Sequence, residues 1–455
     1  MSNPTSATRP GLIDAVPIQK AEEDAVWSKI NWRVVPIILI AYIMAFLDRI
    51  NVGYAKLTMQ LDLNFSDEVY GLGAGIFFIT YLLFEVPSNL WLEKIGARLS
   101  FLRIMVLWGL TSAATAWITT PTHFYIIRLL LGVFEAGFFP GIILYLTYWY
   151  PSHRRGRVTG LFLFGMPITG VFGGPLSGWI MKNFEGVSGW HGWQWVVVLE
   201  GIPTVLIGIA VYFMLANKPE QATFLTDREK QVVEQVMDAD HRGDAQPHHH
   251  GKLAAAFADP KTWVLAFVYF TCACAVYTLT FWMPTMVKAL GITDVARIGW
   301  YTAIPFAGGA IGILLFSRSS DHFQERRWHV AGPLILGAIA LYSTTLLGGA
   351  FALSILMLSI AAFLIFGGGA LFWSIPPTYL SREAAATGIA VISSIGILGG
   401  FVSRTLIGWV KTATGSLNNG LLVMMAVICL GGLTLLLAVP KGAARVGEAM
   451  PDVAH

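Results

Sequence analysis

FLDRINVGY, residues 46–54, places an aspartate and an arginine near the end of an apolar run that begins at Trp32. The run is long enough to cross a bilayer, because a membrane-spanning helix needs about 20 apolar residues. Charged side chains inside such a segment are costly and by default indicate a functional site. The stretch therefore predicts a membrane-spanning helix in which Asp48 and Arg49 belong to a working site.

The composition of the whole chain is that of a membrane protein. Of its 455 residues, 55% are hydrophobic and only 13% are charged, about half the charged fraction of a soluble domain. The three cysteines all lie in apolar runs, so we expect neither a disulfide framework nor a zinc site. The chain has no nucleotide-binding loop and no metalloprotease motif. We therefore expect no cofactor, no ATP-driven step, no nucleic-acid partner and no enzymatic activity.

Twelve apolar segments of roughly membrane-spanning length follow one another along the chain. We place them at residues 33–55, 71–92, 99–118, 122–148, 156–181, 193–216, 260–288, 298–317, 330–349, 353–379, 386–411 and 418–439. The longest polar interruption falls between the sixth and the seventh segment. The expected organisation is an arm (1–32), a six-helix bundle (33–216), a central loop (217–259), a second six-helix bundle (260–440) and a tail (441–455). The predicted fold class is an all-α membrane protein with twelve transmembrane helices.

The two halves repeat one another. YPSHRRGRVTG (150–160) leads into a helix that ends in Gly-Trp, and YLSREAAATG (379–388) leads into another with the same ending. Pseudo-symmetric halves related as parallel repeats predict a binding site at their interface, near the midplane of the membrane. Lysine and arginine gather after the second, fourth, eighth and twelfth helices. This bias predicts that both termini and the central loop are cytoplasmic.

Four charged residues in the N-terminal half make chemical sense together. Asp48 and Arg49 are neighbours on one helix, about 100° apart around its axis, whereas Arg128 and Glu135 are seven residues apart and share a stripe. Arginine presents a planar fork that holds a carboxylate and stays charged. A partly desolvated acid beside an arginine can take up or release a proton as a substrate anion arrives or leaves. The alternative is that Asp48–Arg49 and Arg128–Glu135 are fixed pairs that only hold helices together.

Other polar residues have a structural interpretation. Glu85 and Asn89 lie in the second helix near its predicted cytoplasmic end, and we expect gate or structural roles for them. Glu200 is expected to have a structural partner. Gate salt bridges and topology are the expected roles of three further basic residues, Lys94, Arg98 and Arg157. The histidine run 248–250 lies in the polar central loop, where we expect no metal.

Taken together, these motifs resemble the anion:cation symporter branch of the major facilitator superfamily, across essentially the whole chain. The matching stretches are FLDRINVGYA (46–55), FFITYLLFEVPSNLWLEKIGAR (77–98), RLLLGVFEAGFFPG (128–141), GWQWVVVLEGIP (192–203) and the Tyr277-x-x-x-Phe281-Trp282-Met283-Pro284 run. The resemblance implies that Arg49 and Arg128 bind the anion and that Asp48 and Glu135 are the proton-coupling residues. The first motif looks most like the tartrate and phthalate permeases.

Two positions depart from the family pattern. Many relatives carry an asparagine that contacts substrate where Ser393 stands, and relatives usually carry a proline near Arg404. Arg404 could meet a second carboxylate of the substrate, or it could face the membrane rim and extend toward water. The aromatic residues available to line a cavity are Tyr42, Tyr277, Trp282 and Trp373.

The predicted protein is a monomeric symporter in a bacterial cytoplasmic membrane, in contact with lipid, that imports an organic carboxylate with protons. A dicarboxylate or an aromatic acid, such as tartrate or phthalate, is the expected substrate. An anion exchanger or an exporter of organic acids is the alternative, because sequence does not fix the direction of transport. A membrane-embedded receptor without transport is the more distant one.

Overall fold

The computed structural model describes residues 19–243, 257–380 and 382–440, and its regular elements are all helices. The N-terminal bundle consists of α1 (Lys20–Asp62), α2 (Asp67–Ile95), α3 (Ala97–Ala114), α4 (Pro121–Glu135), α5 (Phe138–Trp149), α6 (Ser152–Leu163), α7 (Gly165–Asn183) and α8 (Gly192–Met214). The C-terminal bundle consists of α11 (Pro260–Ala289), α12 (Val295–Phe323), α13 (Arg327–Ser343), α14 (Phe351–Leu371), α15 (Pro376–Tyr379), α16 (Arg382–Thr414) and α17 (Leu417–Ala438). Between them lies α9 (Asp227–Gly243).

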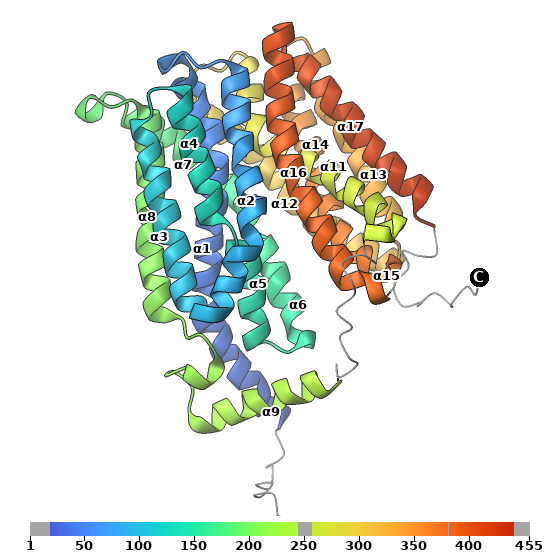
Figure 1. The fold of residues 1–455 in the computed structure, drawn as a ribbon. Coiled ribbons are helices and arrows are strands. Elements are labelled where there is room, and N and C mark those ends of the chain that lie inside the picture. The colour runs from blue at the N-terminus through green and yellow to red at the C-terminus, as the bar shows by residue number, and fades with distance from the viewer. Residues whose placement is uncertain (1–18, 244–256, 381, 441–455) are drawn as a thin grey trace, which may run out of the picture.

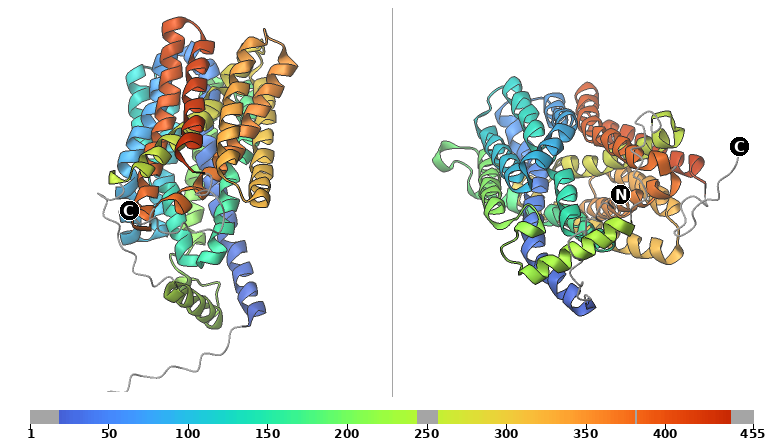
Figure 2. Two further views of the ribbon diagram at one scale, coloured as in Figure 1. Left: turned by 90° about the vertical axis from the view of Figure 1, so that its right-hand side faces the viewer. Right: turned by 60° about the horizontal axis from the view of Figure 1, so that its bottom comes forward.

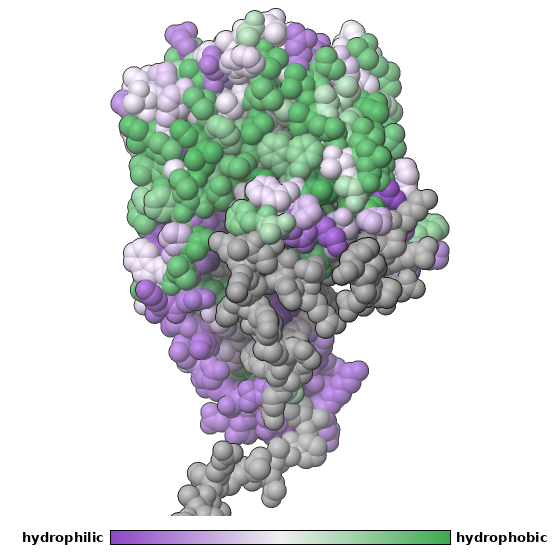
Figure 3. Space-filling view, turned by 45° about the vertical axis from the view of Figure 1, so that its right-hand side comes forward, coloured by the Kyte–Doolittle hydropathy of each residue, from purple (hydrophilic) through white to green (hydrophobic). Residues whose placement is uncertain are grey.

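Twelve spans in the described part of the chain are long and apolar enough to cross a membrane, which confirms the predicted fold class. The two bundles stand side by side (Figure 1), and on the face shown in Figure 3 a band of hydrophobic surface lies between more polar ends. We call the end where α1 begins and α17 ends the terminal face. The opposite end, where α2 begins at Asp67 and α16 ends at Thr414, is the far face.

Three of the spans are broken helices, whereas the sequence suggested single segments. The fourth span stops at Glu135 and resumes at Phe138, with Gly137 between them in a left-handed conformation at φ +82°. Pro140 has no N–H to donate to the carbonyl of Ala136, and its ring would clash with that carbonyl in a continuous helix. The fifth span breaks at Phe164, and the tenth between Leu371 and Pro376. Conversely, α1 begins at Lys20, well before the predicted start at residue 33.

The two bundles meet through glycines near the far face. A Cβ atom on Gly71 of α2 would lie 2.6 Å from the carbonyl oxygen of Arg404, and one on Gly174 of α7 would lie 2.8 Å from that of Gly299. Small residues let helix backbones approach this closely. Toward the terminal face the bundles diverge (Figure 1). This conformer is therefore closed at the far face.

Substituting alanine for Gly174 is expected to weaken this closure. The added methyl group would lie 2.5 Å from Tyr54 Oη and 2.6 Å from Thr302 Oγ1, a pair that itself joins the two bundles. Overpacking of this kind costs roughly 1–3 kcal/mol. It destabilises the closed conformer, because only there does the methyl group meet these two side chains. Double electron–electron resonance between spin labels at Val187 and Thr293, on opposite bundles, should show a longer distance.

The control for this substitution is Gly332→Ala. Gly332 lies in α13, and a Cβ atom there has no neighbour within 4 Å. The label distance should not change in this variant. A Gly174→Ala protein with the distance distribution of the control would contradict the assigned role of this contact.

At the terminal face, α9 attaches to the N-terminal bundle. Glu229 pairs with Lys29 of α1 at 2.8 Å, and Arg228 pairs with Glu22 at 2.8 Å. Asp240 accepts a hydrogen bond from the backbone N–H of Ser152 at 2.9 Å. The right-hand view of Figure 2 shows α9 lying across this bundle. The pairs described for α9 therefore tie the linker between the bundles to the first bundle.

Candidate functional site

A pocket of about 190 Å³ lies between the two bundles. Its lining residues come from α1, α2, α5, α7, α11, α16 and the break in the tenth span: Tyr42, Ala45, Phe46, Arg49, Phe78, Tyr81, Glu85, Phe138, Phe139, Met166, Tyr269, Tyr277, Trp373, Ser393 and Ile397. The volume is below the range of about 300–1,000 Å³ typical of pockets for drug-sized ligands. The pocket, which we call the central pocket, therefore suits a small metabolite.

Arg49 is the cation of the central pocket. Its guanidinium group pairs with Glu135 at 2.6 Å, and the Glu135 side chain is fully buried. Both hydrogen-bonding nitrogens of Arg49 contact the same oxygen, Oε1, and Oε2 of Glu135 has no partner within the described residues. The rings of Phe46, Phe77 and Tyr81 lie about the guanidinium, with centroids 5.1–5.6 Å away. Arg49 therefore lines the central pocket, whereas Glu135 is buried behind Arg49 and does not line it.

The break in the fourth span determines the electrostatic surroundings of Glu135. Glu135 is the last residue of α4, at the carbonyl end of the helix. That end of a helix carries a partial negative charge, which disfavours an ionised carboxylate there. The arginine from α1 compensates for this charge. A proton on Glu135 would remove the need for compensation and release Arg49.

Asp48 points away from the central pocket, into the interior of the N-terminal bundle. Trp108 Nε1 donates to its Oδ2 at 3.0 Å, Asn51 Nδ2 donates to its Oδ1 at 3.3 Å, and the hydroxyl of Ser112 donates to Oδ1 as well. Within the described residues it has no salt-bridge partner. The neighbouring pair Asp48–Arg49, one of the fixed pairs considered above, does not form in this conformer.

Arg128 is also buried and does not line the central pocket. Its Nε and a terminal nitrogen donate to the carbonyl oxygens of Gly73 and Ala74, at 3.3 and 3.4 Å. It lies against Phe77, as Arg49 does. The seven-residue spacing suggested a pair with Glu135, but the acid turns to Arg49 instead. The roles predicted for Asp48 and Arg128 stay predictions.

Arg404 is buried where the bundles meet, not at the membrane rim. Its terminal nitrogens donate to the carbonyl oxygens of Ala74 at 3.2 Å and Arg49 at 3.4 Å, and its Nε has no partner within the described residues. Phe78 and Tyr277, which line the central pocket, have ring centroids 4.9 and 5.5 Å from the guanidinium. Arg404 therefore lies directly behind the pocket wall, with no carboxylate paired to it among the described residues.

The structure separates the residues expected at the gates. Glu85 lines the central pocket, closer to the site than expected, and Asn89 donates to the Glu85 carbonyl oxygen at 3.1 Å. Lys94 is exposed at the end of α2. Arg98 donates to the carbonyl oxygen of Tyr212 at 2.8 Å and so joins α3 to α8. The side chain of Arg157 and the histidine run 248–250 lie outside the described residues.

Sequence reasoning missed an ionic cluster at the far face. Asp67 of α2 pairs with Lys56 of α1 at 2.7 Å and with Lys411 of α16 at 2.9 Å, so it joins the two bundles. Lys56 also lies 3.8 Å from the ring centroid of Trp282, so this tryptophan belongs to the cluster and not to the pocket lining. A lysine near the end of an apolar segment was the available signal.

A second ion pair between the bundles lies at the same face. Lys182 of α7 pairs with Asp294, the N-cap of α12, at 2.6 Å. The hydrogen bond from Lys182 and the backbone N–H groups of α12 hold the pKa of Asp294 below its usual range. A lowered carboxyl pKa means that the pair contributes fully at neutral pH and is lost only as the pH falls through that lowered pKa. It therefore stays ionised near neutral pH.

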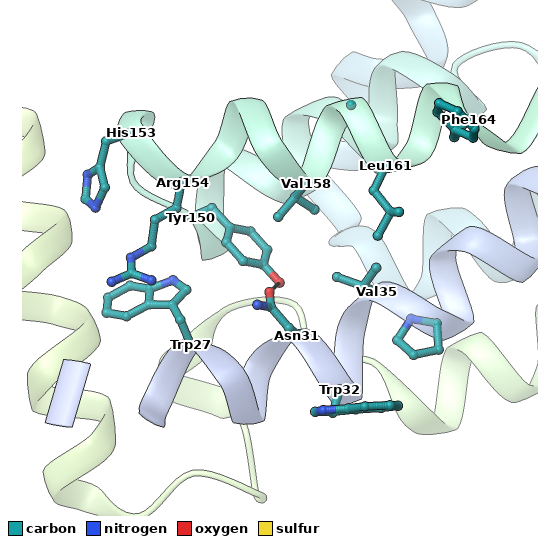
Figure 4. A pocket seen from close by; sticks show the side chains of 12 residues that line it. Trp27, Asn31, Trp32, Val35, Tyr150, His153, Arg154, Val158, Leu161 and Phe164 are labelled. Atoms are coloured by element: carbon teal, nitrogen blue, oxygen red, sulfur yellow. Dashed lines mark hydrogen bonds between the residues drawn. The ribbon is translucent and has the colours of Figure 1, made fainter. Parts of the chain in front are cut away.

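A larger pocket, of about 780 Å³, opens at the terminal face (Figure 4). Trp27, Asn31 and Val35 line it from α1, and Val158 and Leu161 from α6. Its cation, Arg154, is already paired with Glu23 and Asp24 at 2.9 and 2.6 Å. The arginine in the described lining of this pocket is therefore already paired with two carboxylates. We place the candidate site in the central pocket, where a cation meets a buried acid.

Comparison with known proteins identifies the family. A model of the Major Facilitator Superfamily matches residues 38–404. A protein of Pseudomonas putida, provisionally named metabolite transport protein NicT, is 45% identical over 89% of this chain and 92% of its own. One from Agrobacterium vitis, provisionally named a tartrate transporter, is 43% identical over 91% and 92%. A quinolone resistance transporter of Acinetobacter baumannii is 38% identical over 89% and 93%.

The fold has solved counterparts. A bacterial homologue of the human lysosomal transporter Spinster, solved in an inward-facing and occupied conformation, superposes with a TM-score of 0.73 over 90% of this chain and 97% of its own. Its sequence identity is 16%, so the likeness concerns the fold alone.

Proposed function

The chain belongs to the Major Facilitator Superfamily and is a multi-pass membrane transporter, not an enzyme; we propose that it imports a small organic carboxylate together with protons. The observation that carries the proposal is the Arg49–Glu135 pair at the wall of the central pocket. An arginine at a pocket wall can bind a carboxylate, but here its charge is already taken by a buried acid. A proton on Glu135 frees the arginine, and a substrate carboxylate takes the place of the acid.

Because Glu135 and the substrate carboxylate compete for Arg49, binding of the proton and binding of the anion are coupled. If a proton on Glu135 raises the affinity for the anion, the bound anion must raise the affinity for the proton by the same factor. Asp48 is the second proton-coupling residue of the proposal. Arg128, which shares the Phe77 ring with Arg49, is a second anion-binding residue that reaches the substrate in another conformer of the cycle.

The proposed transport cycle is built on the observation that this conformer is closed at the far face. We assign the terminal face to the cytoplasm, because lysine and arginine gather after the second, fourth, eighth and twelfth membrane spans. The described conformer is then inward-facing, and its Arg49–Glu135 pair is the state after substrate and proton have left. In the outward-facing state, protons bind first, the anion then binds Arg49, and the neutralised site lets the bundles rock inward.

Two acids matter for the driving force. Moving one charge through 100 mV changes the free energy by about 2.3 kcal/mol. One proton makes the entry of a monoanion electroneutral, and two make it driven by the membrane potential. A dianion needs both protons only to become electroneutral. The number of titrating acids therefore sets which substrates the membrane potential can help.

The substrate proposed is a dicarboxylate or an aromatic acid. Tyr42, Tyr277 and Trp373 in the pocket lining suit an aromatic ring. Arg404 lies behind Tyr277 without a carboxylate among the described residues, and we propose that it binds the second carboxylate once this wall moves. Ser393 lines the same pocket and offers a hydroxyl group to the substrate.

Uptake into proteoliposomes that hold an inward-directed proton gradient tests this proposal. We would offer phthalate, tartrate and hydroxyphenylacetate separately, and compare the wild type with Arg404→Ala. We expect accumulation of a dicarboxylate that a protonophore collapses and that Arg404→Ala largely abolishes. If only the monocarboxylate accumulates, and Arg404→Ala does not change its accumulation, the result would support symport but would show that Arg404 does not bind the substrate.

An exporter or an exchanger is the second candidate, favoured by the relative named for quinolone resistance. Exchange of labelled for unlabelled anion would survive collapse of the proton gradient, whereas symport would then accumulate nothing. Export would show as proton-driven extrusion from cells. Binding without any movement across a sealed vesicle would indicate a receptor and overturn both transport readings.

A further inference from the structure

Glu200 is a buried acid that the mechanism above leaves without a role. It lies on α8 with 4% of its surface exposed, and it has no salt bridge within the described residues. The hydroxyl of Ser177 on α7 donates to its Oε1 at 2.8 Å. Its Oε2 is buried and has no hydrogen-bond partner in the described part of the chain. The expected structural partner therefore exists, but it satisfies only one of the two oxygens.

The surroundings of Glu200 differ from those of Asp48. Asp48 receives hydrogen bonds from Trp108, Asn51 and Ser112, an arrangement that suits an ionised carboxylate. If Glu200 were ionised, its buried Oε2 would accept no hydrogen bond from the described residues and have no salt-bridge partner among them. Isolated charges are expensive inside the membrane. The two sites therefore suit opposite protonation states, with the proton on Glu200.

Asn51 connects the two acids. It donates to Asp48 at 3.3 Å and also interacts with Glu200. Among the described residues, the titratable Tyr54 of α1 also interacts with Glu200. From α3, uncharged Gly109 and Ala113 pack next to it, against Gly201. Among the residues that the structure describes, no cation forms a salt bridge with Glu200.

Glu200 also lies closer to the far face than Asp48 does. It is eight residues from the start of α8 at Gly192, which corresponds to roughly 12 Å along the helix axis. Asp48 is fourteen residues from the end of α1 at Asp62, or roughly 21 Å. In the proposed orientation, a proton from outside therefore passes the level of Glu200 before it reaches that of Asp48.

We propose that Glu200 is a proton-binding residue of the transport cycle that passes its proton to Asp48. In this step the O–H bond at Glu200 breaks, an O–H bond forms at Asp48, and no electron or other group moves. The negative charge passes in the opposite direction, so the pair stays singly charged. The inference rests on the proposed proton symport and names a further residue for it.

The test uses the full-length protein and the variants Glu200→Gln, Glu200→Asp and Thr204→Val. Glutamine keeps the shape and the contact with Ser177 but cannot release a proton. Thr204 is buried on the same helix, and its hydroxyl donates to the Glu200 carbonyl oxygen at 3.1 Å. Its replacement by valine controls for packing of α8 without changing an acid.

The first readout needs no substrate. Infrared difference spectra between mildly acidic and mildly alkaline pH should contain the C=O stretch of a protonated carboxyl group. One component of that band should be lost in Glu200→Gln and kept in Thr204→Val, while the components from other acids remain. The Glu200 component should also respond to Asp48→Asn, because the proton then has no acceptor. A spectrum unchanged in Glu200→Gln would overturn the proposal.

The second readout is transport of phthalate and tartrate. In Glu200→Gln we expect gradient-driven accumulation to fall by about tenfold for each pH unit of gradient, with counterflow exchange and its apparent affinity unchanged. Glu200→Asp should restore coupling, and Thr204→Val should behave as wild type. Equal losses of accumulation and exchange would indicate a packing role and contradict the proposal. If the wild type transports neither anion, that result would count against the proposed function. The infrared band would then be the only test of whether Glu200 binds a proton.

Discussion

Replacing Arg49 by alanine should strongly weaken substrate binding, and this is the largest effect we expect from a single substitution. Arg49 is the only cation among the described residues that line the central pocket. The substitution removes the positive charge that would bind the substrate carboxylate, and it leaves Glu135 buried without its partner. Truncating one side of a buried, hydrogen-bonded charge pair costs about 2–5 kcal/mol. Affinity for tartrate or phthalate should therefore fall by at least roughly thirtyfold, measured by equilibrium binding to the purified protein.

The matched variant is Arg49→Lys. Lysine keeps the charge but loses the planar fork that holds a carboxylate through two parallel hydrogen bonds. We expect intermediate affinity, with thermal stability closer to that of the wild type than in the alanine variant. Unchanged anion affinity in Arg49→Ala would place the binding site elsewhere, and Arg128 and Arg404 would be the next residues to test.

Glu135→Gln should uncouple transport from the proton gradient, the second large effect. Glutamine can still accept a hydrogen bond from Arg49 but carries no charge and takes up no proton. A pH gradient of about two units contributes roughly a hundredfold of accumulation for each coupled proton. Gradient-driven accumulation in proteoliposomes should fall by that factor for one proton, while counterflow exchange continues because Arg49 is now free for the anion.

Asp48→Asn provides the companion measurement. If both acids take part, each single variant should lose one proton of the stoichiometry, and the reversal potential of transport should shift accordingly. The proton-coupling scheme would be wrong if Asp48→Asn and Glu135→Gln both kept full pH-driven accumulation. Loss in Glu135→Gln alone would make Asp48 a structural acceptor for Trp108 and Ser112.

The structure changes the pairing on which these predictions rest. The alternative considered from the sequence was two fixed pairs, Asp48–Arg49 and Arg128–Glu135, and neither pair is present in this conformer. The rotation of about 100° between consecutive residues turns Asp48 toward α3 and Arg49 toward the pocket and Glu135. The ion pair on which the proposed coupling depends therefore joins two helices that are far apart in the sequence.

Sequence alone was enough to identify the class of protein, the twelve spans and the charged residues inside them. Hydropathy is a local property, and a span of about 20 apolar residues has few alternatives to a membrane helix. Charged residues in such spans are rare enough to be recognised one by one, as Asp48, Arg49, Arg128, Glu135 and Arg404 were.

Tertiary structure alone decided which of these residues meet. The break before Pro140 places Glu135 at a helix end facing Arg49, and glycine contacts at the far face bring Arg404 against backbone carbonyl groups of α1 and α2. It also decided that Glu200 shares Asn51 with Asp48. Such pairings depend on helix rotation and on the approach of distant segments, which the spacing of residues along one helix does not fix.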